Sequence, residues 1–224
     1  MSGILTITSV EQDPKKKQRY YLYVNEAQEP FTSVHEDLLI KFRLLKGREI
    51  EADELKQIVL EDSHHRAYVA ALAYLGARPR TEKEIMRYLA RKALDEQAAR
   101  QAIERLRKEG LVNDPVYAEL YAAQRMRSQM KGRRLLQQEL LQRGIKRDTA
   151  KEAASKLNAE SETEIAVSAA MKKWPHIKGE IRERKQKLAA FLLRRGFPSS
   201  SVREAVKAAA EAELDDDDGL MLDN

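Results

Sequence analysis

Apolar and polar residues alternate along the first fifty positions, as they do in β-strands. Residues 4–10 are rich in β-branched side chains and Thr, residues 19–24 place Tyr20, Leu22 and Val24 on one face, and residues 31–34 form a third short run. Turn-forming residues separate the three runs. The pattern predicts a small antiparallel meander.

Helical spacing replaces this alternation before residue 62. Apolar residues recur there at intervals of three and four, which predicts two short helices. The two stripes are Leu38, Phe42 and Leu45, and, after Gly47, Leu55, Ile58 and Val59. We therefore expect residues 1–62 to form an N-terminal extension that combines strands and helices.

From about Ser63 the pattern is purely helical and repeats itself. The residues around one predicted turn recur after 51 positions and again after a further 52. The matching segments are Leu89, Lys92, Ala93 and Leu94; Leu140, Arg143, Gly144 and Ile145; and Leu192, Arg195, Gly196 and Phe197. Tetratricopeptide, ankyrin and armadillo arrays are excluded because their periods are about 34, 33 and 40–47 residues.

Each repeat of about fifty residues has room for three short helices. In the first repeat, Thr81 and Glu84 have the spacing of a capping box, and Gly110 can end the third helix in a left-handed conformation. Asp114 followed by Pro115 suits the N-cap and first position of the next helix. We expect repeats at residues 63–113, 114–158 and 159–210.

These features predict a mainly α fold. Tandem three-helix repeats, in an elongated arrangement, follow the small β-meander and its helices, and packing between neighbours should supply much of their stability. Residues 211–224 carry seven acidic and no basic side chains, so we expect a disordered acidic tail. Its role could be solubility or the shielding of a basic surface.

The composition excludes several classes of protein. The chain has no cysteine, so it can form neither a disulfide nor a thiolate metal site, which fits a reducing compartment. The first ten residues do not resemble a signal peptide, and charges interrupt every apolar run before it reaches the roughly 20 residues that cross a bilayer. We expect a soluble, cytoplasmic protein that does not bind membranes.

Charge is distributed unevenly along the chain. Residues 63–210 hold 32 basic and 17 acidic side chains, a net charge of +15, whereas residues 1–62 carry −3 and residues 211–224 carry −7. A segment this basic is typical of proteins that bind a polyanion or an acidic surface. The alternative is a solvated helical face rich in Lys and Arg.

A search for catalytic motifs finds no Gly-rich phosphate loop, zinc-protease helix or nucleophile elbow. Two of the four histidines, His64 and His65, are adjacent, but neighbours on a helix point to different faces and make poor co-ligands. We expect no enzymatic activity, no metal and no cofactor. The tyrosines lie near apolar stripes and favour packing over base stacking, and Trp174 should anchor a core.

Basic residues are the best candidates for function. The second helix of each repeat ends in a cation, and further cations flank it, so stacked repeats would carry a row of positive charge that suits a long anionic partner. A cation at a helix C-terminus also stabilises the helix itself, so a purely structural role stays open. The candidates are Arg78, Arg80, Arg91, Lys92, Arg125, Arg127, Lys131, Arg133, Arg134, Arg143, Lys185, Arg194 and Arg195.

Three segments carry a family resemblance, and they run from Ala73 to Ile85, from Gly110 to Ala118, and from Glu139 to Ile145, with sequences AYLGARPRTEKEI, GLVNDPVYA and ELLQRGI. Together they resemble the RecX family of recombination regulators. The resemblance covers roughly residues 63–209, and the segment 34–37 is similar to the extension of longer members from Gram-positive bacteria.

The resemblance implies tandem three-helix repeats and binding to the RecA recombinase filament, along its helical groove. There such a protein would mainly inhibit ATP hydrolysis and strand exchange, or promote filament loss, in DNA repair, recombination and the SOS response. It further implies possible binding to single- and double-stranded DNA, and we expect a monomer. The rival hypothesis is a DNA-binding or architectural protein whose three-helix units act as helix-turn-helix readers.

Overall fold

The computed structural model describes the backbone of residues 3–220 and the side chains of residues 3–213. The chain divides into two compact units. The first runs to Arg78 and includes residues 85–111, and the second combines residues 79–84 with the chain from Val112 onward.

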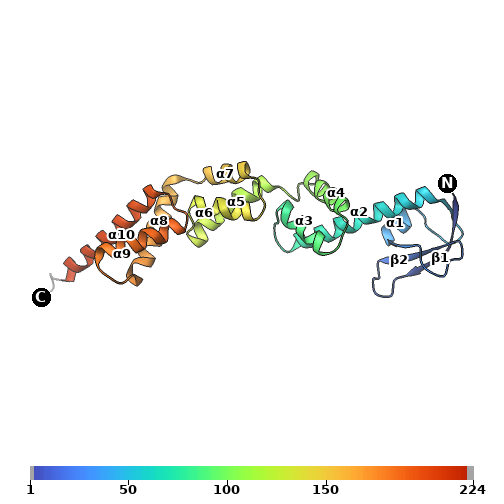
Figure 1. Cartoon of the computed structure of the whole chain (residues 1–224), viewed down its shortest axis with the longest axis horizontal. Helices are drawn as coiled ribbons and strands as arrows, with labels where there is room; N and C mark the ends of the chain where they lie inside the picture. The colour runs from blue at the N-terminus through green and yellow to red at the C-terminus, as the bar shows by residue number, and fades with distance from the viewer. Residues whose placement is uncertain (1–2, 221–224) are drawn as a thin grey trace. The chain divides into compact units, whose positions relative to one another are not determined.

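The described part of the chain is mainly α, as predicted, with a small sheet at its start (Figure 1). Its elements are β1 (Ile4–Gln12), β2 (Arg19–Val24), β3 (Thr32–His35), α1 (Glu36–Lys41), β4 (Glu49–Glu51), α2 (Ala52–Gly76), α3 (Glu82–Arg91), α4 (Glu96–Lys108), α5 (Asp114–Gln129), α6 (Arg133–Gln142), α7 (Arg147–Ser155), α8 (Ala159–Lys173), the 3-10 turn η1 (Trp174–His176), α9 (Ile181–Arg194) and α10 (Ser199–Leu220).

The N-terminal sheet has the strand order β3-β2-β1-β4, and every neighbouring pair is antiparallel. This confirms the meander, since β1, β2 and β3 follow one another in the sheet. Ile7, Leu22, Val34 and Ile50 are buried on its inner side. β4 was not predicted: a strand of three residues is too short to show an alternating pattern, and its pairing with β1 creates it.

The helix after the meander is shorter than its apolar stripe predicts. α1 ends at Lys41, and Arg43 takes a left-handed conformation with φ of 48°. The turn places Leu44, and not the Leu45 of the predicted stripe, in the core. Leu44 is fully buried, while Leu45 remains 61% exposed. The predicted continuation of the helix to Leu45 is wrong because the turn at Arg43 interrupts its periodicity.

α2 is one helix of 25 residues. The sequence analysis divides this region at residue 62, between a short helix and the first repeat, but no Gly or Pro lies between Ala52 and Leu75 to break the helix. Asp62, at the expected boundary, is buried and forms an ion pair of 2.7 Å with Arg19 of β2. The helix therefore runs through the expected boundary, and the division into an extension and a first repeat stays a prediction.

The later part of α2 packs on α4 in the first unit. Ala67, Ala98 and Ala102 form the centre of this contact. Tyr68 packs against them, and its hydroxyl donates a hydrogen bond of 2.7 Å to Glu109. Gly110 follows α4 with φ of 72°, the left-handed conformation expected there. These small side chains let the two helices approach closely.

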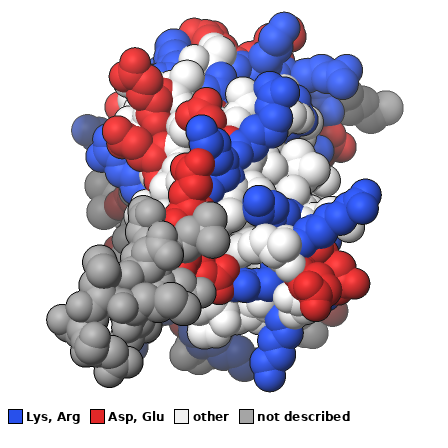
Figure 2. Space-filling view, turned by 90° about the vertical axis from the view of Figure 1, so that its left-hand side faces the viewer, with Lys and Arg blue, Asp and Glu red and all other residues white. Residues whose placement is uncertain are grey.

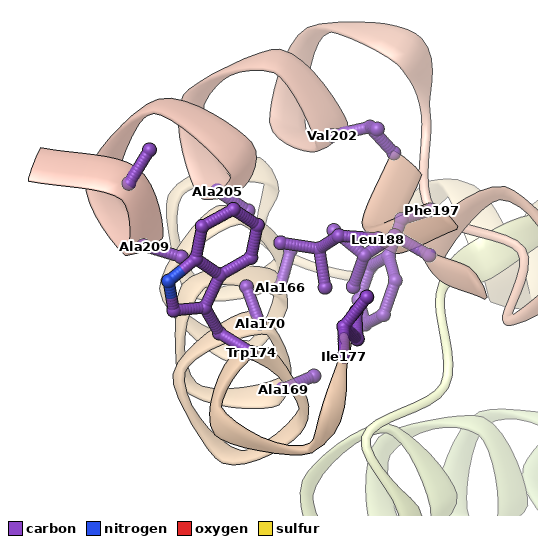
Figure 3. Close-up of a cluster of buried hydrophobic side chains, with 12 residues drawn as sticks. Ala166, Ala169, Ala170, Trp174, Ile177, Leu188, Phe197, Val202, Ala205 and Ala209 are labelled. Atoms are coloured by element: carbon purple, nitrogen blue, oxygen red, sulfur yellow. The ribbon is translucent and has the colours of Figure 1, made fainter. Parts of the chain in front are cut away.

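The second unit contains two further three-helix groups, α5–α7 and α8–α10 (Figure 1). Each has its own buried core. In the last group, Trp174 lies at the end of α8 among the small side chains of α8 and α10, and Leu188 and Phe197 fill the other side (Figure 3). The Trp174 indole is 4% exposed and donates a hydrogen bond of 2.9 Å to Glu213, so it is the core anchor predicted.

The acidic end of the chain differs from the expectation of a disordered tail. α10 continues to Leu220, and residues 221–224 lie outside the described residues. The helix passes through the Ala-rich segment 208–212, and Glu213 forms an ion pair of 2.8 Å with Arg184 of α9. Strong helix formers and this contact carry the helix beyond residue 211. None of the described helices is both long and apolar enough to cross a membrane.

Candidate partner-binding surface

The backbone carbonyl that ends a helix accepts a hydrogen bond from the start of another helix at two places in the second unit. The Arg143 carbonyl, at the end of α6, accepts a hydrogen bond of 2.8 Å from the Thr81 hydroxyl, just before α3. The Arg195 carbonyl, at the end of α9, accepts one of 2.8 Å from the Gly132 N–H, just before α6. We call these contacts the Arg143 joint and the Arg195 joint.

Glycine is needed at both joints for two reasons. Gly144 and Gly196 have φ of 93° and 85°, values that other residues rarely adopt. A Cβ atom at Gly144 would overlap the Lys83 side chain, and one at Gly196 would overlap the backbone of Leu135. The turn at the equivalent position in the first unit has Ala93, with φ of 52°, and this residue is exposed.

The Thr81–Glu84 capping box is present and also serves the Arg143 joint. The Thr81 hydroxyl accepts a hydrogen bond of 3.1 Å from the Glu84 N–H, and a Glu84 carboxylate oxygen accepts one of 3.2 Å from the Thr81 N–H. The other oxygen of Glu84 accepts a hydrogen bond of 2.7 Å from Arg143, which also donates one of 3.2 Å to the Tyr117 hydroxyl. Burial raises the pKa of Tyr117. Arg143 therefore has several partners within the fold.

Arg195 has the corresponding role at the other joint. Its guanidinium donates to the carbonyl oxygens of Gln129 at 2.6 Å and Met130 at 3.3 Å, and it lies 4.9 Å from the Phe191 ring centroid. Met130 follows α5 with φ of 48°, so Arg195 holds the turn between α5 and α6.

At each joint, a carboxylate from another helix caps the N-terminus of the helix that packs there. Glu162 of α8 is fully buried, and it accepts hydrogen bonds from the Arg133 backbone N–H at 2.8 Å and the Arg133 side chain at 2.5 Å. Asp114 accepts one of 3.0 Å from the Glu82 N–H, at the start of α3. The prediction that Asp114 caps its own helix is wrong, since Asn113 caps α5 by accepting from the Val116 N–H. Asp114 points instead to the helix packed against it.

Lys131 is likewise engaged. It forms an ion pair of 2.5 Å with Glu139, whose carboxylate also accepts a hydrogen bond of 2.9 Å from the Tyr121 hydroxyl. Burial raises the pKa of Glu139, but the hydrogen bonds from Lys131 and Tyr121 outweigh it, so the pKa lies below its usual value. Lys131, Arg133, Arg143 and Arg195 thus all have a role within the fold, and their contact with a partner stays a prediction.

The other predicted cations are mostly exposed. Arg80 and Arg125 are half-buried, and the Arg125 guanidinium lies 5.3 Å from the Tyr121 ring centroid. In the first unit the exposed candidates are Arg78, Arg91 and Lys92, and in the second they are Arg127, Arg134, Lys185 and Arg194. The structure therefore separates the predicted row of cations into residues that hold the joints and residues that face solvent.

A groove of about 660 Å³ lies at the Arg195 joint. Its lining residues are Ser128, Gln129, Met130, Lys131, Leu135, Lys172 and Arg195. Arg127, Arg134 and Arg194 each stand next to a lining residue in the sequence. We call the groove with these three neighbours the basic groove. The lining itself contains the cations Lys131, Lys172 and Arg195, so an anionic group on a partner would find positive charge there.

Lys172 is a member of this groove that the sequence analysis missed. It lies in the last turn of α8, beside Lys173. The Lys172-Lys173 pair is visible in the sequence, but it lies at the end of the first helix of the third repeat, outside the repeated turn that follows each second helix. On the face of the molecule drawn in Figure 2, basic and acidic side chains are interspersed.

The comparisons with known proteins agree with the fold. Residues 67–106, 113–153 and 160–206 match the family models for the first, second and third three-helix domains of RecX. The chain is 30% identical to the regulatory protein RecX of Listeria welshimeri over 94% of this chain and 78% of that protein. It is 31% identical to the regulatory protein RecX of Halalkalibacterium halodurans, over 89% of this chain and 76% of that protein.

Two solved structures have the same fold. One, a crystal structure of a regulatory protein RecX, superposes with a TM-score of 0.71 and 31% identity, covering 91% of this chain and 98% of that chain. The other, RecX from Lactobacillus salivarius, gives a TM-score of 0.60 at 27% identity, covering 66% of this chain and 97% of that chain. With all three domains matched in order, the chain belongs to the RecX family of regulatory proteins.

Proposed function

We propose that this protein binds the RecA recombinase filament and regulates it, mainly by inhibiting ATP hydrolysis and strand exchange and by reducing filament stability. Membership of a family whose relatives are named regulatory proteins is the observation that carries this proposal. The RecA partner comes from the family resemblance, and the basic groove supplies a surface that suits it.

The basic groove can contact a filament without any chemical reaction. Arg127, Arg134 and Arg194 are exposed, so their guanidinium groups can reach carboxylates on a protein or phosphates on a bound strand. Arg is suited to both because its planar fork matches either anion. Binding across neighbouring subunits would oppose the rearrangements that accompany ATP turnover, so regulation requires no catalytic residue.

The test is a titration of the protein into RecA assembled on single-stranded DNA, following ATP turnover and filament length. We expect inhibition by the unchanged protein. Arg127→Glu, Arg134→Glu and Arg194→Glu together should raise the half-inhibitory concentration by about 10-fold or more, because each lost charge contact is worth about 0.5–1 kcal/mol. Arg133 and Arg143 are unsuitable targets, since their reversal would disturb the joints.

A matched control uses exposed cations that neither line the groove nor neighbour a lining residue in the sequence. Lys146, Arg147 and Lys151, at or in α7, change to Glu with the same change in net charge. This triple variant should inhibit almost as well as the unchanged protein. Equal loss in both variants would indicate a general charge effect and would remove the basic groove from the proposal, and no inhibition by the unchanged protein would overturn the proposal itself.

DNA binding without RecA is the rival outcome. It can be measured with labelled single- and double-stranded oligonucleotides over a range of salt concentrations. Phosphate binding weakens steeply and linearly on a logarithmic scale as salt rises. If inhibition fell with the same slope as DNA binding, competition for the strand would replace contact with RecA as the mechanism.

A further inference from the structure

Three side chains with metal-ligating atoms meet in the first unit. They are His35, Asp37 and His65, and one ligand atom of each lies within 4.8 Å of the others. An Asp37 carboxylate oxygen is 3.3 Å from His35 Nδ1 and 3.6 Å from His65 Nε2. The two imidazole ring centroids are 4.6 Å apart. Two nitrogens and one carboxylate oxygen therefore lie close together.

The fold holds these residues in place from three elements. His35 ends β3, Asp37 lies in the first turn of α1, and His65 lies in α2. Asp62, one turn before His65, accepts a hydrogen bond of 2.8 Å from the His35 backbone N–H while it pairs with Arg19. The buried Asp62 carboxylate thus fixes His35 against α2, so bringing the ligands together costs little additional ordering.

His65 is the member whose polar atom has no other use. Its Nε2 is buried and makes no hydrogen bond to the described residues. Asp37 is largely exposed, so it contributes a negative charge at the solvent side of the cluster.

We propose that His35, Asp37 and His65 form a site for a zinc ion, with water as the fourth ligand. Two imidazoles and one carboxylate suit Zn²⁺, whereas Mg²⁺ and Ca²⁺ prefer oxygen ligands alone. The bound ion would link the end of β3 and the start of α1 to α2. This inference does not depend on the proposed function.

The site is compatible with the contacts that these residues make. His35 Nδ1 accepts a hydrogen bond of 3.2 Å from the Asp37 N–H, and the ion would take over that lone pair. Asp37 is an exposed residue in the first turn of α1, so water can accept the freed N–H. Losing such a bond costs about 1 kcal/mol, which is small beside the free energy of coordinating zinc.

No metal site was expected from the sequence, because the only histidines close together in the chain are His64 and His65. His64 and His65 are indeed poor co-ligands as a pair. The partners of His65 lie about thirty residues earlier, beyond the end of a strand, and only the packing of β3 and α1 on α2 brings them close. Separations of this kind have no short spacing that a motif search could recognise.

The experiment uses the full chain, treated with a chelator and then titrated with Zn²⁺ in competition with a chromogenic chelator. We expect one equivalent to bind. His65→Asn and Asp37→Asn should each weaken binding by about 100-fold or more, since each removes one of three ligands. His64→Asn is the matched control, because it removes the adjacent imidazole and should leave zinc affinity unchanged.

Cobalt(II) provides a second readout that does not depend on affinity alone. Its visible absorption should show the strong bands of four-coordinate geometry in the unchanged protein and in His64→Asn, and lose them in His65→Asn. His35→Asn should lose them as well while keeping an N-cap acceptor for α1. Circular dichroism confirms that each variant is folded. Equal zinc binding in His64→Asn and His65→Asn, or no binding by the unchanged protein, would overturn the site.

Discussion

The turn that ends the second helix of each three-helix domain occurs three times, and its three copies differ. After α6 and α9 it contains Gly144 and Gly196, and the start of another helix presses against each. After α3 it contains Ala93, which is exposed. The preceding cation follows the same division: Arg143 and Arg195 are held by partners, whereas Lys92 is exposed and lies 5.8 Å from the Tyr88 ring centroid. A sequence repeat therefore marks equivalent positions without assigning them equivalent roles.

The largest expected effect breaks this contrast at the glycine. Gly196→Ala places a methyl group against the Leu135 backbone in a left-handed turn, and we expect a loss of about 3 kcal/mol in the free energy of unfolding. Ala93→Gly should change stability by less than about 1 kcal/mol. Trp174, the single tryptophan, reports on the second unit in urea denaturation, and circular dichroism reports on the whole chain. Similar losses in both variants would show that close packing does not distinguish the two turns.

A second test compares two adjacent cations at the Arg195 joint. Arg133→Ala leaves the buried Glu162 carboxylate without its ion pair, and we expect a loss of about 2 kcal/mol, since the backbone N–H still serves Glu162. Arg134→Ala, at an exposed position, should cost less than about 0.5 kcal/mol. Urea denaturation followed by Trp174 fluorescence measures both. If the two variants were equally stable, the separation into joint-holding and exposed cations would fail.

A third test uses the equivalent cations themselves. Arg143→Met and Arg195→Met keep much of the side-chain volume but remove the hydrogen bonds, so each should lower the free energy of unfolding by about 1 kcal/mol. Lys92→Met should have almost no effect. Thermal denaturation of the three variants side by side gives the comparison, and a Lys92→Met variant as unstable as the others would contradict it.

The smallest effect concerns acid stability. The pKa of Glu139 is lower in the folded protein than its ordinary value, so the folded state binds this proton less readily than the unfolded state does. Its contribution is fully present above the ordinary carboxyl pKa of about 4.3 and is lost as the pH falls through the lower folded value. Glu139→Gln should flatten the fall in stability below about pH 4.3. An unchanged pH profile would show that the Lys131 and Tyr121 contacts do not favour the ionised form.

Local patterns predicted the local structure well. Alternation found the first three strands, the Thr81–Glu84 spacing found a capping box, and Trp174 was correctly expected in a core. Some failures arise because the deciding contact comes from a distant part of the chain. Asp114 caps α3 and not its own helix, because its carboxylate meets the Glu82 N–H only after the domains pack.

The candidate site shows the same limit. The basic character of residues 63–210 was evident from the sequence, but which cations have partners within the fold was not. Their carboxylate partners Glu84, Glu139 and Glu162 lie 59, 8 and 29 residues away in the chain. The Thr81 hydroxyl likewise reaches a carbonyl 62 residues away. The groove at the Arg195 joint, with Lys172, exists only through such contacts.

The continuity of α2 has a consequence for how the N-terminal region unfolds. At about 1.5 Å per residue, this helix is a rod of about 37 Å whose first turns complete the sheet core and whose last turns complete the α4 contact. Truncation at residue 63 would cut the rod and expose uncapped N–H groups in its middle. The sheet and the first three-helix domain should therefore melt cooperatively, as one thermodynamic body with a single transition.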